Sequence, residues 1–269
     1  MGKNKNFWDS YKDFTFEEKN LKLLPLCHNT ESKLVEQIVD DKKFQRKNCK
    51  YLKKKVSFFF YGNPYFFSDD YKLPVILAFS LKDEKSYSLF KFVPFDSGSN
   101  ILLKKYFKSS KIRINIEQVR NEFILSESNP ISFIRKHISF YFSDNENYFK
   151  AEFLHNKRKV RNQQAYSNSL YLFLLWESLK ASYNKKGLKY LDQRAFSIEA
   201  HAENEIYLKD LKIEFFYGPE SQKDYVKKNF ENGSSAIIET YDGFDMDPSY
   251  IIQKGVDRFE KFLRYRKLL

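Results

Sequence analysis

The amino-acid sequence predicts an α+β fold, in which a β-sheet core carries a helical insertion and ends in a C-terminal helix. Runs of β-branched and aromatic residues, typical of strands, gather in residues 22–93 and 195–240, whereas helical periodicity dominates between them. The chain has 269 residues, 18% aromatic, with only 8 Gly and 7 Pro, so it is long enough to bury a substantial core. We expect a single domain over residues 1–269, with a mainly helical insertion at about 100–190.

The first part of the predicted core contains four strands and one helix. Residues 22–28 read as a buried strand, and residues 31–40 as a helix that Thr30 or Asn29 can cap. Three further strands are expected at 56–61, 73–81 and 88–93. The inward stripe of the helix consists of Leu34, Val35, Ile38 and Val39.

The remaining elements alternate in character. Helices are expected at 101–107, 116–125, 130–142 and 171–183, with Pro130 in a first turn and His137 as a packing residue. Strands are expected at 195–201, 211–216 and 236–240, and a surface helix at 222–232. Asp247 followed by Pro248 predicts the cap and first residue of the C-terminal helix.

The composition limits the partners and the compartment. The net charge of +12 favours polyanions such as nucleic acid, a nucleotide or an acidic protein, and two basic tracts, 42–55 and 155–164, are candidate phosphate-contacting surfaces. Cys27 and Cys49 make no disulfide framework, and the four histidines show no paired metal-ligand spacing, so no metal is expected. With no membrane-spanning run and no signal-peptide core, the expected location is cytoplasmic, without a membrane partner.

Three short segments place polar residues at or between the ends of expected strands. Cys27-His28-Asn29-Thr30 ends the first strand, Gly62-Asn-Pro-Tyr65-Phe-Phe-Ser68 follows the second, and Asn204-Glu205-Ile-Tyr207 lies between late strands. In these motifs and their order the chain resembles the ADP-ribosyltransferase superfamily, especially the branch that uses a His, a Tyr and a Glu. The motifs cover about a tenth of the chain.

The resemblance implies a split antiparallel β-sheet core and NAD as the substrate. It implies cleavage of the nicotinamide–ribose bond and transfer of ADP-ribose to a protein or nucleic-acid acceptor. His28 and Thr30 would hold the nicotinamide ribose, and Glu205 would be the catalytic carboxylate. Glu199, which also lies near the late strands, is a second candidate for that carboxylate.

An aromatic ring would stack on the nicotinamide, beside Gly62 and Ser68. Tyr65 is the residue at the matching position of the motif. Pro64 stands where the superfamily has a small residue, so Tyr61 remains an alternative stacking ring. An aromatic face suits this role because the nicotinamide ring is cationic.

Analogy with the superfamily further implies a toxin or antiviral (anti-phage) defence role, with a neutralising or complex partner. The alternative reading is a basic nucleic-acid-binding or nuclease module, in which basic residues interleaved with aromatic ones contact phosphates and bases. The nuclease would use Glu199, Glu203, Glu205 and Lys209, whose spacing matches no recognised pattern. A third reading is an accessory protein that acts through contacts alone.

Overall fold

The computed structural model describes residues 8, 21–49, 52–64, 72–96, 123–152, 196–230, 236–242 and 247–269. The chain divides into two compact units. Unit 1 comprises Met1–Leu21 and Lys91–Glu199, and unit 2 comprises Lys22–Phe90 and Ala200–Leu269. The insertion expected at about 100–190 falls within unit 1, and much of it lies outside the described residues.

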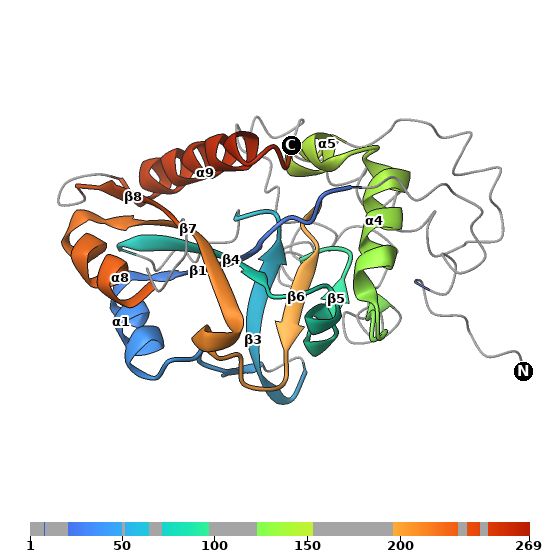
Figure 1. The fold of residues 1–269 in the computed structure, drawn as a ribbon, viewed down its shortest axis with the longest axis horizontal. Coiled ribbons are helices and arrows are strands. Elements are labelled where there is room, and N and C mark those ends of the chain that lie inside the picture. Colours follow the sequence, from blue (N-terminus) through green and yellow to red (C-terminus); the bar gives the residue numbers. More distant parts are fainter. Residues whose placement is uncertain are drawn as a thin grey trace, which may run out of the picture. The chain divides into compact units, whose positions relative to one another are not determined.

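Unit 2 is built on a mostly antiparallel sheet with the strand order β6-β3-β1-β4-β7-β8, and β2 pairs with β3 (Figure 1). Only the β7–β8 pair is parallel among the strand pairs whose register is described. The predicted mixture of helices with a largely antiparallel sheet is thereby confirmed. The strands are β1 (Leu26–Glu31), β2 (Lys47–Cys49), β3 (Lys54–Tyr61), β4 (Pro74–Leu81), β6 (Glu199–Ala202), β7 (Leu211–Pro219) and β8 (Ile237–Tyr241).

Helices cover both faces of this sheet. The helix α9 (Pro248–Tyr265) packs on β7 and β4, where Phe259 and Phe262 lie against Phe215 with ring centroids 5.4 and 5.2 Å away. Its predicted cap is confirmed, because the Asp247 carboxylate accepts a hydrogen bond from the Ser249 N–H at 2.8 Å. The opposite face carries α1 (Ser32–Asp40), and α8 (Lys223–Phe230) packs against β7 and β8 (Figure 1).

Unit 1 contains the strand β5 (Lys91–Val93) and the helices α4 (Pro130–Tyr141) and α5 (Asn145–Phe149). The indole N–H of Trp8 donates to the Phe123 carbonyl at 2.6 Å. His137 is fully buried beside Trp8 and Tyr141, as expected of a packing residue, and this burial lowers its pKa to about 3. No described helix of the chain has the length and apolar character needed to cross a membrane.

Three sequence-based expectations need correction. Neither Thr30 nor Asn29 caps α1, because β1 continues through Glu31 by pairing with β4; Glu31 is the N-cap and makes no side-chain cap bond. The strand expected at 88–93 is a 3₁₀ helix over Lys85–Leu89 followed by the short β5. Leu125 forms an isolated bridge with Phe92 instead of ending a helix. The helices expected at 101–107 and 171–183 and the basic tract 155–164 lie outside the described residues.

Several described residues have positive φ, and two of them, Gly62 and Lys42, differ in how well their side chains suit the left-handed backbone conformation. Gly62, which ends β3, has φ of +63°, and its N–H donates to the Pro25 carbonyl at 2.8 Å. Lys42 has φ of 55° after α1, where its N–H bonds the Val39 carbonyl and the Lys43 N–H bonds the Ile38 carbonyl. These two bonds form a Schellman motif, in which glycine is the preferred residue at the Lys42 position.

We expect Gly62→Ala to lower the free energy of unfolding by about 2–4 kcal/mol, through left-handed strain and overpacking. An added Cβ would stand 2.3 Å from Leu24 Cδ1. Urea denaturation measures this loss. Lys42→Gly is the matched control and should gain about 1 kcal/mol, since it relieves the same backbone strain at an exposed position. Equal stability of Gly62→Ala and wild type would contradict the strain argument.

Candidate functional site

The central strand β1 pairs with its two neighbours over different lengths. Its register with β4 runs from Leu26↔Phe79 to Glu31↔Pro74, whereas its register with β3 consists of Leu26↔Tyr61 and Cys27↔Phe60. Beyond Cys27, the Nδ1 atom of His28 lies 2.9 Å from the Phe58 carbonyl oxygen. A side-chain hydrogen bond therefore satisfies a β3 carbonyl at the point where the two strands part.

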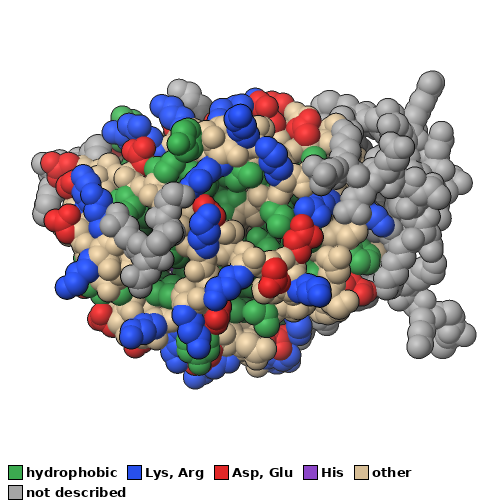
Figure 2. Space-filling model, in the orientation of Figure 1, with side chains coloured by type: hydrophobic (Ala, Val, Ile, Leu, Met, Phe, Trp, Pro, Cys, Tyr) green, Lys and Arg blue, Asp and Glu red, His purple; other side chains and the backbone are tan. Residues whose placement is uncertain are grey.

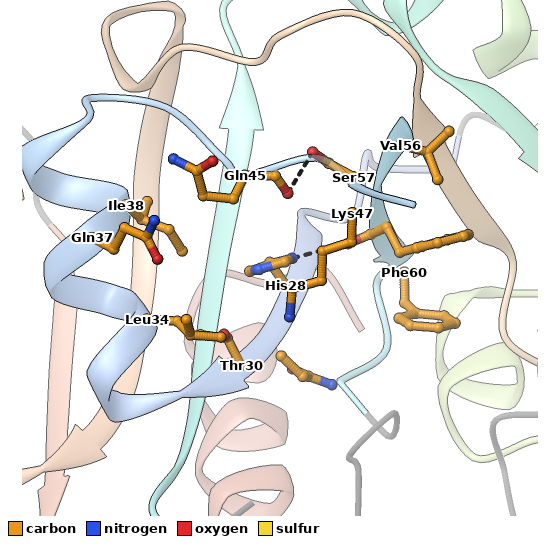
Figure 3. A pocket seen from close by; sticks show the side chains of 12 residues that line it. His28, Thr30, Leu34, Gln37, Ile38, Gln45, Lys47, Val56, Ser57 and Phe60 are labelled. Carbon is orange, nitrogen blue, oxygen red and sulfur yellow. Dashed lines mark hydrogen bonds between the residues drawn. The ribbon is translucent and has the colours of Figure 1, made fainter. Parts of the chain in front are cut away.

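A pocket of about 360 Å³ opens at this point (Figure 3). Its walls come from β1, from one side of α1, from the segment 45–47 and from β3. Figure 3 shows side chains of α1 facing His28 and Lys47. The pocket combines apolar surface with amide, hydroxyl, imidazole and ammonium groups, as small-molecule sites do. Its lining residues are His28, Asn29, Thr30, Leu34, Gln37, Ile38, Gln45, Lys47, Val56, Ser57, Phe58 and Phe60.

His28 is held as a neutral ring. Burial lowers its pKa to about 4; the bond to the Phe58 carbonyl opposes this shift, and the positive charge of Lys47 adds to it. Since a carbonyl only accepts, Nδ1 carries the proton and Nε2 presents a lone pair. Among the described residues, none hydrogen-bonds Nε2. The rings of Phe44 and Phe59, with centroids 4.8 and 5.4 Å away, fix the imidazole from the sides.

Asn29 connects the first motif to the start of the second. Its Nδ2 donates to the Pro64 carbonyl at 2.5 Å, next to the turn that Gly62 makes. Tyr61 is 1% exposed, and its hydroxyl accepts the Leu24 N–H at 3.1 Å, so its ring lies in the core. Tyr65 and Ser68 lie outside the described residues.

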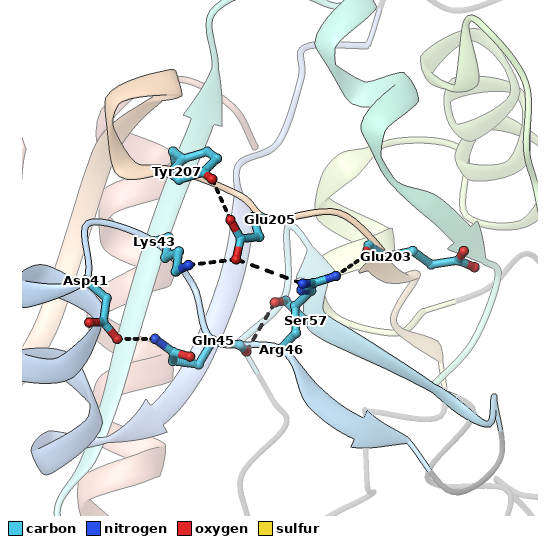
Figure 4. A network of polar contacts seen from close by, with 8 residues as sticks. All are labelled: Asp41, Lys43, Gln45, Arg46, Ser57, Glu203, Glu205 and Tyr207. Carbon is cyan, nitrogen blue, oxygen red and sulfur yellow. Dashed lines mark hydrogen bonds and ion pairs between the residues drawn. The ribbon is translucent and has the colours of Figure 1, made fainter.

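Glu205 is the centre of a polar network on a neighbouring surface (Figure 4). Its Oε1 accepts from Lys43 Nζ at 2.6 Å, and its Oε2 accepts from the Tyr207 hydroxyl at 2.5 Å. Arg46 lies 3.9 Å from Oε1 and donates to the Glu203 carbonyl at 2.8 Å. The bond from Lys43, followed by that from Tyr207, lowers the pKa of Glu205, which keeps the carboxylate ionised.

The Glu205 network holds one wall of the pocket in place without lining it. Backbone bonds join Phe44 N–H to the Ile206 carbonyl and Leu208 N–H to the Lys42 carbonyl, each at 2.9 Å. The segment that these bonds anchor continues into Gln45 and Lys47, which do line the pocket. The side chain of Glu205 is 32% exposed and is not among the described lining residues. The other candidate, Glu199, opens β6 with its side chain buried, at 2% exposure.

Sequence reasoning missed the individual roles of Lys43 and Lys47. Both lie in the basic tract 42–55, which marked a phosphate-contacting surface as a whole. The register of β2 with β3 places the side chains of Lys47 and Val56 together on the pocket side of this strand pair. Sequence alone does not reveal that register. Lys43 joins Glu205 across 162 residues, a separation that local patterns do not report.

The charge distribution bears on the alternative functions. Over the face drawn in Figure 2, lysine and arginine side chains alternate with acidic ones and form no single basic patch. Within the described ranges, no group of three or more His, Cys, Asp or Glu side chains is arranged to hold a metal ion. Neither observation favours a metal-dependent nuclease.

Comparison with models of protein families, with curated proteins and with solved structures finds no match.

We expect acid to destabilise the protein through His28. In the unfolded chain the imidazole takes up a proton near pH 6.5, whereas in the folded chain it stays neutral down to about pH 4. The unfolded state thus binds more protons in this window, and stability falls as the pH is lowered through it. Between pH 7.5 and 5 the wild type should lose about 2 kcal/mol more than His28→Asn, which keeps an N–H donor near the Nδ1 position.

Chemical denaturation of both proteins across this pH range measures the difference. His137 remains in both proteins, so its contribution cancels. Parallel stability curves for the two proteins would show that His28 titrates normally in the folded chain.

Proposed function

We propose that the chain is an NAD-dependent ADP-ribosyltransferase whose substrate binds in the pocket beside His28. One observation carries this proposal: His28, Asn29 and Thr30, three of the four residues of the first motif, together line a pocket of a size typical of small-molecule sites. The bond from Asn29 to the Pro64 carbonyl supports it further, because it brings the start of the second motif to the same place. We also propose that the parting of β1 and β3 corresponds to the split sheet of this superfamily.

The chemistry assigned to the site is cleavage of the bond between nicotinamide and ribose. Nicotinamide leaves with the bonding electron pair, positive charge develops on the ribose, and a protein, nucleic-acid or water nucleophile takes the vacated position. A carboxylate near the ribose stabilises that charge. The neutral His28 suits the role of accepting a hydrogen bond from a ribose hydroxyl through Nε2.

Glu205 is the proposed catalytic carboxylate, and its surroundings set a condition on that role. The ionised form is secured by Lys43, but both oxygens already have partners within the chain. To stabilise the ribose cation, the carboxylate must exchange at least one of these partners for the substrate.

The partners that both Glu205 oxygens already have also favour a second candidate function, that of a nucleotide-binding protein without turnover. If Lys43 and Tyr207 keep Glu205 throughout, the pocket binds a ligand and the network only supports its wall. Nicotinamide release distinguishes the two functions.

The experiment quantifies free nicotinamide from NAD with wild type, Glu205→Gln, Glu199→Gln and Glu220→Gln, each assayed with and without cell lysate as a source of acceptors. Glu220 is a matched control, because it too is bonded by a lysine, Lys223, and by a hydroxyl, that of Thr240. We expect Glu205→Gln to lower turnover about a hundredfold or more and Glu220→Gln to leave it unchanged.

Each outcome assigns the function. Loss of turnover in Glu199→Gln alone would transfer the catalytic role to Glu199. Absence of nicotinamide release by wild type, even with lysate, would reject the transferase and leave the nucleotide-binding protein.

A further inference from the structure

Lys47 is a cation that lines the pocket. It opens β2, and its position opposite Val56 in the β2–β3 pair puts both side chains on the same side of the hairpin. Both residues line the pocket, and Figure 3 shows Lys47 beside His28. Its charge acts on the imidazole, since it contributes to the lowered pKa of His28.

Lys47 has no counter-ion among the residues that the structure describes. The described lining of the pocket contains no aspartate or glutamate. Two other lysines of the tract 42–55 differ in this respect, because Lys43 pairs with Glu205 at 2.6 Å and Lys54 with Glu203 at 3.0 Å. A cation on a pocket wall without a carboxylate favours an anionic ligand group.

A second, smaller pocket of unit 2 provides a contrast. It has a volume of about 220 Å³ and is also lined by cations, Lys212 and Arg266. Both lie near the same carboxylate, with Lys212 at 3.0 Å and Arg266 at 3.6 Å from oxygens of Glu214. Its positive charge is thus partly neutralised from within the chain, unlike that beside Lys47.

The other groups of the larger pocket narrow the ligand class. His28 offers a lone pair at Nε2 for a hydroxyl, and Leu34, Ile38 and Phe60 offer apolar surface for a ring. A ligand that combines a hydroxyl-bearing sugar, a planar ring and an anion matches this set. A phosphorylated nucleoside has all three parts.

We propose that Lys47 forms a phosphate subsite, so that the pocket selects nucleotides over the corresponding nucleosides. The inference rests on the proposed function in taking this pocket as the substrate site. It goes beyond that function by assigning a specificity-determining residue outside the three motifs. A lysine ammonium suits a phosphate oxygen as a compact, hydrogen-bonding point charge.

The test uses two pairs of compounds that differ by one phosphate. These are nicotinamide mononucleotide with nicotinamide riboside, and AMP with adenosine. Calorimetry measures their affinities for wild type, Lys47→Gln and Lys47→Arg. Lys55→Gln is the matched control, because Lys55 is an exposed lysine opposite Asn48 on the other face of the same hairpin.

We expect Lys47→Gln to weaken binding of the phosphorylated compounds about tenfold and to leave nucleoside affinity unchanged, as loss of a charged hydrogen bond predicts. Lys47→Arg should retain the preference, and Lys55→Gln should match wild type. The preference should decline as the salt concentration rises.

The result is independent of catalysis. A preference for the phosphorylated member of either pair that disappears in Lys47→Gln supports the subsite, even where NAD releases no nicotinamide. Equal affinities within both pairs, including no binding of any compound, overturn it. A preference that Lys55→Gln lowers as much as Lys47→Gln also overturns it, because general surface charge would then be the cause.

Discussion

The hydrogen bond between His28 and the Phe58 carbonyl is the interaction on which the site depends. Where β1 and β3 part, the Phe58 carbonyl lies beyond their paired residues, and a carbonyl removed from water without a donor is costly. The imidazole provides that donor, which fixes its tautomer and directs the other nitrogen's lone pair elsewhere. One bond thus satisfies a strand carbonyl beside the pocket and determines what the ring offers a ligand.

The pocket and the Glu205 network share the short segment 42–47. Its first part is joined to residues 205–208 by backbone bonds and by the Lys43–Glu205 ion pair, and its last residues line the pocket. Glu205 can therefore act on a ligand in one of two ways. Its carboxylate can contact the ligand directly, or its bonds can hold the segment 42–47 that forms a wall of the pocket. Among the described residues, Lys43 has a carboxylate partner, whereas Lys47, which lines the pocket, has none, so we expect Lys47 to act on a ligand there more strongly than Lys43 does.

The sequence predicted the elements whose patterns are local. The apolar run of β4, the stripe of α1 and the Asp247–Pro248 start of α9 each carry their signal within a few residues. The prediction that Asn29 can cap α1 was wrong because of tertiary contacts. Pairing with β4 extends β1 through Glu31, and the Asn29 amide donates to the Pro64 carbonyl instead. His28 could be picked out as a site residue, but its bond to Phe58 depends on where two strands separate, which no local pattern encodes. Lys43 and Lys47 required the register of β2 and a contact across 162 residues.

The order of strands in the sheet has a consequence for synthesis on the ribosome. Strand β4 is strongly apolar and pairs on one side with β7, to which the Ser80 hydroxyl and Glu214 carboxylate add a bond across 134 residues. At usual elongation rates roughly ten seconds or more separate the emergence of these two strands. During that interval one edge of β4 has no native partner, and such an edge invites pairing with other chains. The nascent protein is thus expected to be a client of chaperones that shield β-edges until β7 arrives.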